Sequence, residues 1–441
     1  MKLLRFGALI SFVAGVGSSA YSQALAPWSG EALTVHASVR SIGNPVHGTS
    51  DAPSVSANGR FVAFESFAAD FVAGDTNLTW DVFVRDLAWA RSERVSLASS
   101  GAQGNGPSVE PRISADGRLV VFHSLASNLV PGDTNGTYDV FLRDRLAGTT
   151  ERVSVDSDGV EADSASRYGV ISLDGRFVAF TSQASNLAPG DTNGTHDLFL
   201  KDRVTGTTEL VSIGLGSSPA NSYSDGIAAL SADGRFVAFE SRASNLVALD
   251  TNGSYDVFVR DRLNGTTERV SVDSAGLQGN LPSTWPSISA DGLAVAFDSE
   301  ASNLVAGDTN GARDIFVHDR VSGITARVSV GPGGVQANSG SSNGALSADG
   351  TRVVFTSGAS NLVAGDHNFT SDIFLRDLAA GTNELVSVRA GGAQSNGFSA
   401  RPTLSVNGRT IAFYSLGNLA PTDANFDLDV YAYTDWALPW R

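Results

Sequence analysis

The sequence contains no cysteine and only two lysines, Lys2 and Lys201. The lack of cysteine excludes disulfides, thiolate catalysis, and zinc or iron–sulfur centres held by cysteine. Basic side chains are also few, with 30 Lys and Arg against 46 Asp and Glu, which gives a formal net charge of −16. This balance argues against nucleic acid as a partner, because phosphate binding depends on clustered lysine and arginine.

Long apolar runs are equally scarce. The run over residues 6–17 follows a basic start and is too short to span a membrane. Small residues come next, and this order predicts a secretory signal peptide over residues 1–24, cleaved after Ala24. We therefore expect residues 25–441 to form one exported domain, periplasmic or secreted, monomeric and without membrane insertion.

The chain is built from seven repeats of about 58 residues. Each repeat contains a tetrapeptide of the form Ser-x-Asp-Gly or Ser-x-Asn-Gly, which begins at Ser56, Ser114, Ser172, Ser231, Ser289, Ser347 and Ser405. Asp-Gly and Asn-Gly between apolar runs are strong hairpin signals, and each repeat indicates four short strands. Periods of this size are typical of propellers and solenoids. The sequence predicts an all-β fold, a seven-bladed β-propeller of four-stranded antiparallel blades.

The two ends of the repeat region predict how the ring closes. Residues 33–41 match the fourth strand of a repeat, whereas the last repeat ends with a third strand over 429–433 and has no fourth. The N-terminal strand can therefore complete the last blade, which removes a free sheet edge. Aromatic residues at fixed repeat positions, such as Phe122 and Phe141, are expected in the core between blades.

The repeat also resembles a known family. The pattern Ser-x-Asp-Gly-Arg-x-Val-Ala-Phe-x-Ser, then Asp-[Val/Ile/Leu]-Phe-[Val/Leu]-x-Asp and Arg-Val-Ser, is similar to the WD40-like (PD40) repeat of the TolB-type β-propellers. The resemblance covers about residues 36–435 and implies a propeller fold. Propellers of this family also occur in peptidases and in some polysaccharide lyases, so the fold does not settle the function.

Loop length indicates which face of the propeller is functional. In a four-stranded meander, the loop between the second and third strands and the loop to the next repeat emerge on the same face. Both are long here, for example over residues 124–138 and 156–169, while the other two connections are tight turns. Long irregular loops are uncommon unless they have a function, so the long-loop face is the predicted binding face.

Each long loop between the second and third strands carries the motif Asp-x-Asn-x-x-x-Asp. Two carboxylates and an amide oxygen on a short glycine-bearing turn are ligands that Ca²⁺ prefers. The same side chains can instead cap their own turn through hydrogen bonds to the backbone, which we expect to be their main role. No cofactor is required, and possible Ca²⁺ ligands are Asp75, Asn77, Asp81, Asp133, Asn135, Asp139, Asp191, Asn193, Asp197, Asp250, Asn252, Asp256, Asp308, Asn310, Asp314, Asp366, Asn368, Asp372, Asp423, Asn425 and Asp429.

The sequence shows no sign of a catalytic site. The six histidines occupy different repeat positions, and Arg112 and Trp285 are the only bulky polar or aromatic residues expected in the channel-facing strands. Near-identical repeats predict an exported, non-enzymatic binding or scaffold protein. Its acidic long-loop face would contact an unidentified envelope or extracellular protein or glycan. The alternative is a polysaccharide-acting lyase or hydrolase with a site in the central channel.

Overall fold

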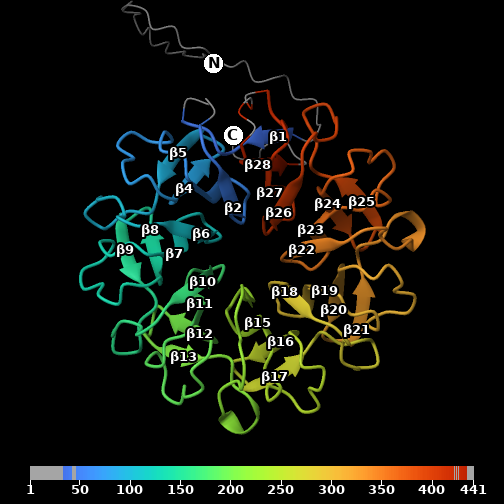
Figure 1. The fold of residues 1–441 in the computed structure, drawn as a ribbon, viewed down its shortest axis with the longest axis horizontal. Helices are drawn as coiled ribbons and strands as arrows, with labels where there is room; N and C mark the ends of the chain where they lie inside the picture. The colour runs from blue at the N-terminus through green and yellow to red at the C-terminus, as the bar shows by residue number, and fades with distance from the viewer. Residues whose placement is uncertain (1–32, 42–45, 422, 424, 426, 435–441) are drawn as a thin grey trace, which may run out of the picture.

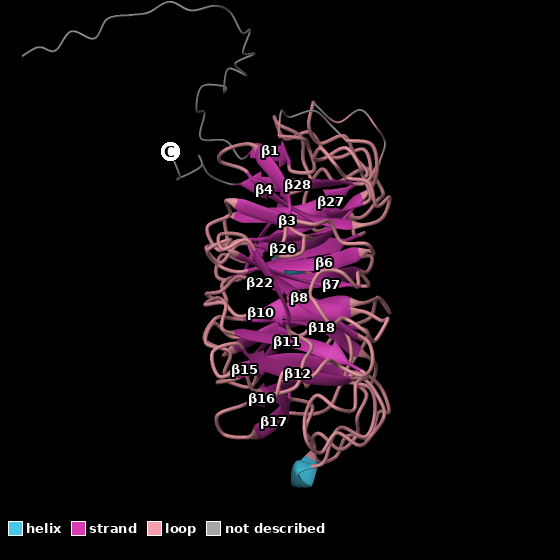
Figure 2. Cartoon of the chain, turned by 90° about the vertical axis from the view of Figure 1, so that its left-hand side faces the viewer, coloured by secondary structure: helices cyan, strands magenta, loops and turns pink. Residues whose placement is uncertain are grey.

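A computed structural model describes residues 33–41, 46–421, 423, 425 and 427–434 of the chain. The described strands form seven four-stranded antiparallel sheets around a central axis (Figure 1). Figure 2 shows the ring from the side, with loops on both faces of a disc of strands. The prediction of an all-β, seven-bladed propeller is therefore confirmed, whereas the predicted signal peptide lies outside the described residues.

Six blades follow the chain from the axis outward. Blade 1 contains β2 (Ser50–Val55), β3 (Phe61–Ser66), β4 (Asp81–Asp86) and β5 (Arg91–Arg94). Blade 2 contains β6 (Ser108–Ile113), β7 (Leu119–Ser124), β8 (Asp139–Asp144) and β9 (Thr149–Arg152). Blade 3 contains β10 (Ser166–Ile171), β11 (Phe177–Ser182), β12 (Asp197–Asp202) and β13 (Thr208–Leu210). Blade 4 contains β14 (Ala229–Leu230), β15 (Phe236–Ser241), β16 (Asp256–Asp261) and β17 (Thr266–Arg269). Blade 5 contains β18 (Ser283–Ile288), β19 (Ala294–Ser299), β20 (Asp314–Asp319) and β21 (Ile324–Arg327). Blade 6 contains β22 (Ser341–Leu346), β23 (Arg352–Ser357), β24 (Asp372–Asp377) and β25 (Thr382–Leu385). The described helices are two short 3₁₀ turns, η1 (Leu215–Ser217) and η2 (Pro332–Gly334), and no helix within the described ranges is long and apolar enough to cross a bilayer.

Blade 7 joins the two ends of the chain. It contains β26 (Ser399–Leu404), β27 (Thr410–Ser415), β28 (Asp429–Thr434) and the N-terminal strand β1 (Leu33–His36). Strand β1 pairs antiparallel with β28, with Leu33 opposite Thr434. The Ser38 hydroxyl donates a 2.7 Å hydrogen bond to Asp429, which strengthens the join. The predicted closure by the N-terminal strand is therefore confirmed.

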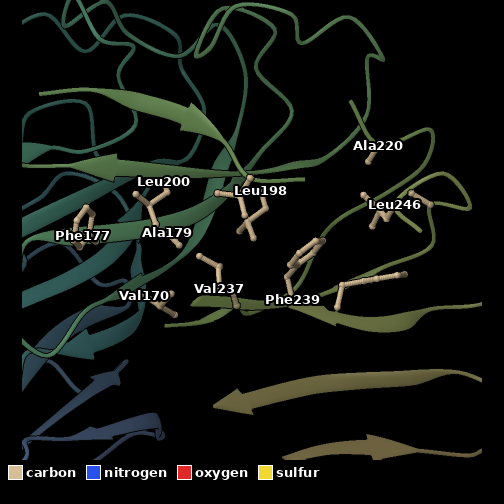
Figure 3. Close-up of a cluster of buried hydrophobic side chains, with 13 residues drawn as sticks. Val170, Phe177, Ala179, Leu198, Leu200, Ala220, Val237, Phe239 and Leu246 are labelled. Atoms are coloured by element: carbon tan, nitrogen blue, oxygen red, sulfur yellow. The ribbon is translucent and has the colours of Figure 1, made fainter. Parts of the chain in front are cut away.

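The hydrophobic core lies between neighbouring blades. The rings of Phe122 and Phe141 are fully buried, with centroids 6.1 Å apart. Figure 3 shows the cluster between blades 3 and 4, in which Leu198 on β12 packs with Val237 and Phe239 on β15. Burial of each such side chain stabilises the fold by about 1.5–3 kcal/mol. Because every blade packs on two neighbours, ring closure matters for the stability of all of them.

The long loops share one face, as their lengths predict. The Asn135 side chain donates a 3.0 Å hydrogen bond to the carbonyl of Ala162, which joins the loop after β7 to the loop after β9. The opposite edge of the same blade carries the two tight turns, held by an ion pair between Arg118 and Asp144. The two faces therefore differ in loop length and in the side chains that hold them.

Candidate functional site

The Asp-x-Asn-x-x-x-Asp loops form a regular hydrogen-bond network, seen clearly in blade 2. Asp139 opens β8 and is fully buried, and its two oxygens accept bonds from Ser154 at 2.6 Å and from Asn135 at 2.9 Å. The side-chain oxygen of Asn135 accepts a 3.0 Å bond from the backbone amide of Thr137, two residues on. Burial raises the pKa of Asp139 to about 6, although these donors oppose the shift.

The turn-capping contact recurs in all seven loops. The asparagine side-chain oxygen accepts a bond from the backbone amide two residues later, at Asn77, Asn135, Asn193, Asn252, Asn310, Asn368 and Asn425. In four loops a glutamine from the next long loop donates to the first aspartate, at Asp75, Asp250, Asp308 and Asp366. The expected turn-capping role therefore has a direct structural basis, and Ca²⁺ binding by the same residues stays a prediction.

A guanidinium lies among the acids of the blade 2 loop. Asp133, Asp139 and Glu161 form the one group in the described ranges whose three possible ligand atoms lie within 4.8 Å of one another. Arg152 forms an ion pair with Glu161, and its Nη1 atom lies 3.8 Å from Asp133 and 3.5 Å from Asp139. This cation offsets part of the negative charge of the three carboxylates. The corresponding arginines in other blades are Arg94, Arg269 and Arg327.

The sevenfold symmetry breaks at the channel. The third residue of each inner strand, or the residue that corresponds to it in blade 4, has a left-handed backbone with φ between 49° and 85°. We call these residues the channel ring: Ala52, Glu110, Tyr168, Gly226, Trp285, Asn343 and Arg401. Residues other than glycine pay a strain of about 1–3 kcal/mol for such a conformation, and strained residues cluster at functional sites. No two blades carry the same residue at this position.

Side chains of the channel ring meet across the axis. Arg401 of blade 7 donates a 2.8 Å hydrogen bond to Glu110 of blade 2, and its guanidinium carbon lies 5.9 Å from the ring centroid of Trp285 in blade 5. Arg112 lies beside them, with Nη2 3.5 Å from the Glu110 carboxylate. These four residues help to line a cavity of about 320 Å³ in the channel. A charged cluster lining a cavity of this size is a candidate binding or active site.

The charged groups of this cluster titrate unusually. Burial would raise the pKa of Glu110, but Arg112 and Arg401 hold it below its usual range. Burial raises the pKa of Glu65 to about 7, and the neighbouring carboxylate of Glu110 adds to this effect. Perturbed carboxyl groups around one cavity are typical of functional sites.

His123 lies next to this cluster on β7. Burial lowers its pKa to about 4, so the imidazole is neutral at pH 7. Its ring makes edge contacts with Tyr138 and Tyr168, at centroid distances of 5.3 and 5.6 Å. Its Nδ1 atom is buried and has no hydrogen-bond partner among the described residues. Buried polar atoms without a partner are uncommon and indicate a functional role or an absent ligand or water.

The sequence-based expectation for the channel was wrong. It named Arg112 and Trp285 as the only bulky polar or aromatic residues there, and it missed Glu110 and Arg401. The inner strands shift register between their second and fifth residues, so the third to sixth residues of blades 1, 6 and 7 all line the cavity. A comparison of the third residue of every inner strand would have revealed this variation.

Comparisons with known proteins support the fold but not the repeat family. No family model matches the chain and no curated protein matches it, so the PD40 resemblance stays a prediction. Similar solved structures include an oligogalacturonate lyase in complex with manganese, with 14% identity over 91% of this chain and 96% of that chain and a TM-score of 0.55. The propeller domain of the trilobed protease from Pyrococcus furiosus has 10% identity over 89% and 96% of the chains and a TM-score of 0.51. A putative TolB from Agrobacterium tumefaciens is less similar, with 17% identity over 64% and 80% of the chains and a TM-score of 0.40.

These comparisons contradict the prediction of a non-enzymatic binding or scaffold protein. The propellers that match over most of their length at a TM-score above 0.5 include two oligogalacturonate lyases and a protease domain. The structure removes the premise of that prediction as well, because the channel ring does carry a polar cluster that differs from blade to blade. At identities of 10–14% the likeness itself shows the shared β-propeller fold.

Proposed function

We propose that the chain is an exported enzyme, periplasmic or secreted, that cleaves an acidic polysaccharide at the channel ring by β-elimination. The observation that carries the proposal is the pairing of Glu110 with Arg401 across the channel, with Arg112 beside them in the same cavity. Two positive charges and one carboxylate suit a substrate that carries its own carboxylate. The similarity to oligogalacturonate lyases, whose name gives a polymer of uronic acid as substrate, supports this choice.

The elimination needs a base and a cation. A base removes the proton from the carbon next to the sugar carboxylate, the carbon–oxygen bond at the following carbon breaks, and a carbon–carbon double bond forms. The leaving glycosidic oxygen keeps the bonding electrons and takes a proton from solvent. A cation on the carboxylate stabilises the charge that develops in the transition state. Arg401 and Arg112 can supply that charge, and Glu110 can accept the proton.

The ion pair with Arg401 gives the site a means of activation. In the free protein, Arg112 and Arg401 keep the pKa of Glu110 low, which makes it a weak base. A substrate carboxylate competes for the same guanidinium groups. When Arg401 turns to the substrate, the pKa of Glu110 rises and the group becomes a better proton acceptor at the moment the sugar arrives.

The channel does not fit the manganese ion named for the lyase of known structure. Within the described ranges, one group of three acidic or histidine side chains has its ligand atoms within 4.8 Å of one another. That group surrounds Arg152 on the long-loop face and does not lie in the channel. The proposed chemistry therefore uses the arginines of the channel as its cations.

Turnover of defined polymers tests the proposal. The protein is incubated with polygalacturonate, with alginate and with uncharged dextran, and the ultraviolet absorbance of the new double bond is followed. We expect product from a uronate polymer only, and loss of turnover in Glu110→Gln and Arg401→Gln. Arg118→Gln is the matched control, because its ion pair with Asp144 holds the tight-turn face. New reducing ends without ultraviolet absorbance would show hydrolysis instead, and no cleavage of any polymer would overturn the proposal.

A further inference from the structure

Three carboxylates connect the channel ring to the preceding blades: Glu65 and Asp298 are buried and Glu240 is partly buried. The Glu240 carboxylate on β15 accepts a 2.7 Å hydrogen bond from the backbone amide of Trp285 in the next blade. Asp298 on β19 accepts bonds from the amides of Asn343, at 2.8 Å, and Gly344, at 3.2 Å. Each acid comes from the second strand of one blade and binds a strained residue of the following blade.

Glu65 makes the same contact between blades 1 and 2. Its carboxylate on β3 accepts a 2.5 Å hydrogen bond from the amide of Glu110. A charged acceptor makes the stronger kind of hydrogen bond, and each such bond offsets the cost of a left-handed residue. All seven ring residues are left-handed, so the fold sets that conformation. We propose that Glu65, Glu240 and Asp298 are positioning residues, which anchor the amides of Glu110, Trp285 and Asn343 to the preceding blade and so fix where their side chains lie over the channel.

The other blades show that this contact is not a general requirement of the fold. The residues at the position of Glu240 in the other four blades are His123, Thr181, Thr356 and Tyr414. The Thr356 hydroxyl has no hydrogen-bond partner among the described residues, although the blade that follows it carries the left-handed Arg401. The three acids precede Glu110, Trp285 and Asn343, whereas the ring residues Tyr168 and Arg401 follow blades with His123 and Thr356 at this position.

The site of Glu240 is shaped around its carboxylate. A side chain at Gly226 would collide with a carboxylate oxygen of Glu240, so glycine at this ring position leaves room for the acid. Burial raises the pKa of Glu240 to about 7, and the charged groups that act on it are Asp225, Asp298 and Arg313. Burial raises the pKa of Tyr255, and the negative charge of Glu240 adds to this shift. Protonation weakens the acceptor, so the position of Trp285 is expected to respond to pH near neutrality.

Fluorescence of Trp285 tests this inference without a substrate. The signal of Trp285 is the difference between spectra recorded with and without Trp285→Phe, in wild-type, Glu240→Gln and Glu240→Leu backgrounds. We expect the wild-type difference signal to change in one step near pH 7, where the pKa of Glu240 lies. Glu240→Gln retains an acceptor and is expected to keep the signal without the step. Glu240→Leu has no acceptor and is expected to shift emission and raise quenching by iodide.

Thr356→Val is the matched control, because it changes the corresponding position where the hydroxyl has no partner. It is expected to leave the Trp285 signal and its pH step unchanged. An identical Trp285 signal in wild type and Glu240→Gln at every pH would overturn the inference, even if the leucine variant does not fold. The consequence for turnover rests on the proposed function: Glu65→Gln should lower kcat through Glu110. Failure of that function alone would leave the fluorescence result intact.

Discussion

Asp298 offers a quantitative test of the buried channel carboxylates through the pH dependence of stability. Its side chain is fully buried, and burial raises its pKa from 3.8 to about 7, although the amides of Asn343 and Gly344 oppose the shift. Between these two values the folded protein holds a proton that the unfolded chain has released. Stability must therefore increase as the pH falls from 7 towards 3.8.

The expected size follows from the shift. Each pKa unit corresponds to about 1.4 kcal/mol, but Asp298 is already about half protonated at pH 7. Lowering the pH from about 7 to about 5 should therefore stabilise the fold by about 2 kcal/mol through Asp298 alone. Asp298→Asn removes this titration and keeps an acceptor for the Asn343 amide. The free energy of unfolding of the wild type should therefore rise by about 2 kcal/mol relative to that of the variant over this range.

Urea unfolding of both proteins at about pH 5 and about pH 7 measures this difference. Asp144→Asn is the control, because a hydrogen bond from Arg118 lowers the pKa of Asp144 to about 2. The stabilisation by Asp144 is complete above its unfolded value of 3.8 and is lost only as the pH falls below it. That variant should parallel the wild type across the measured range. A parallel profile for Asp298→Asn would refute the argument.

Three further predictions follow from the fold and the loops. Deletion of residues 33–41 removes β1 and exposes the edge of β28, so we expect aggregation or a much lower melting temperature by light scattering and circular dichroism. Ser154→Ala removes a donor to Asp139 and an acceptor for the Val140 amide, both buried, and should destabilise the protein by about 2–3 kcal/mol in urea unfolding. Calorimetry with millimolar Ca²⁺ tests whether the long loops bind the ion. Side-chain amides and guanidinium groups already contact the loop carboxylates, so we expect no heat of binding and no effect of a chelator on the melting temperature. Binding of one ion per loop would instead support the calcium hypothesis.

Much of the fold could be read from the sequence because its signals are local. Strand alternation, the Asp-Gly turns and the repeat period predict the blades, and the missing fourth strand of the last repeat predicts closure by β1. The turn caps were also predictable, since the side chain of Asn135 acts on a residue two positions away. The loop network across repeats was not, because Arg152 and Glu161 reach Asp133 only after neighbouring loops come together.

The channel was decided by tertiary structure alone. Glu110 and Arg401 are 291 residues apart, and no local pattern relates them. Their meeting depends on ring closure, which brings blade 7 beside blade 1, and on a backbone shift that overrides the alternation of a regular strand. Residues at one repeat position look like independent surface variation along the chain. When the ring closes, residues of different blades such as Glu110 and Arg401 meet in one cavity, and together they form a single site.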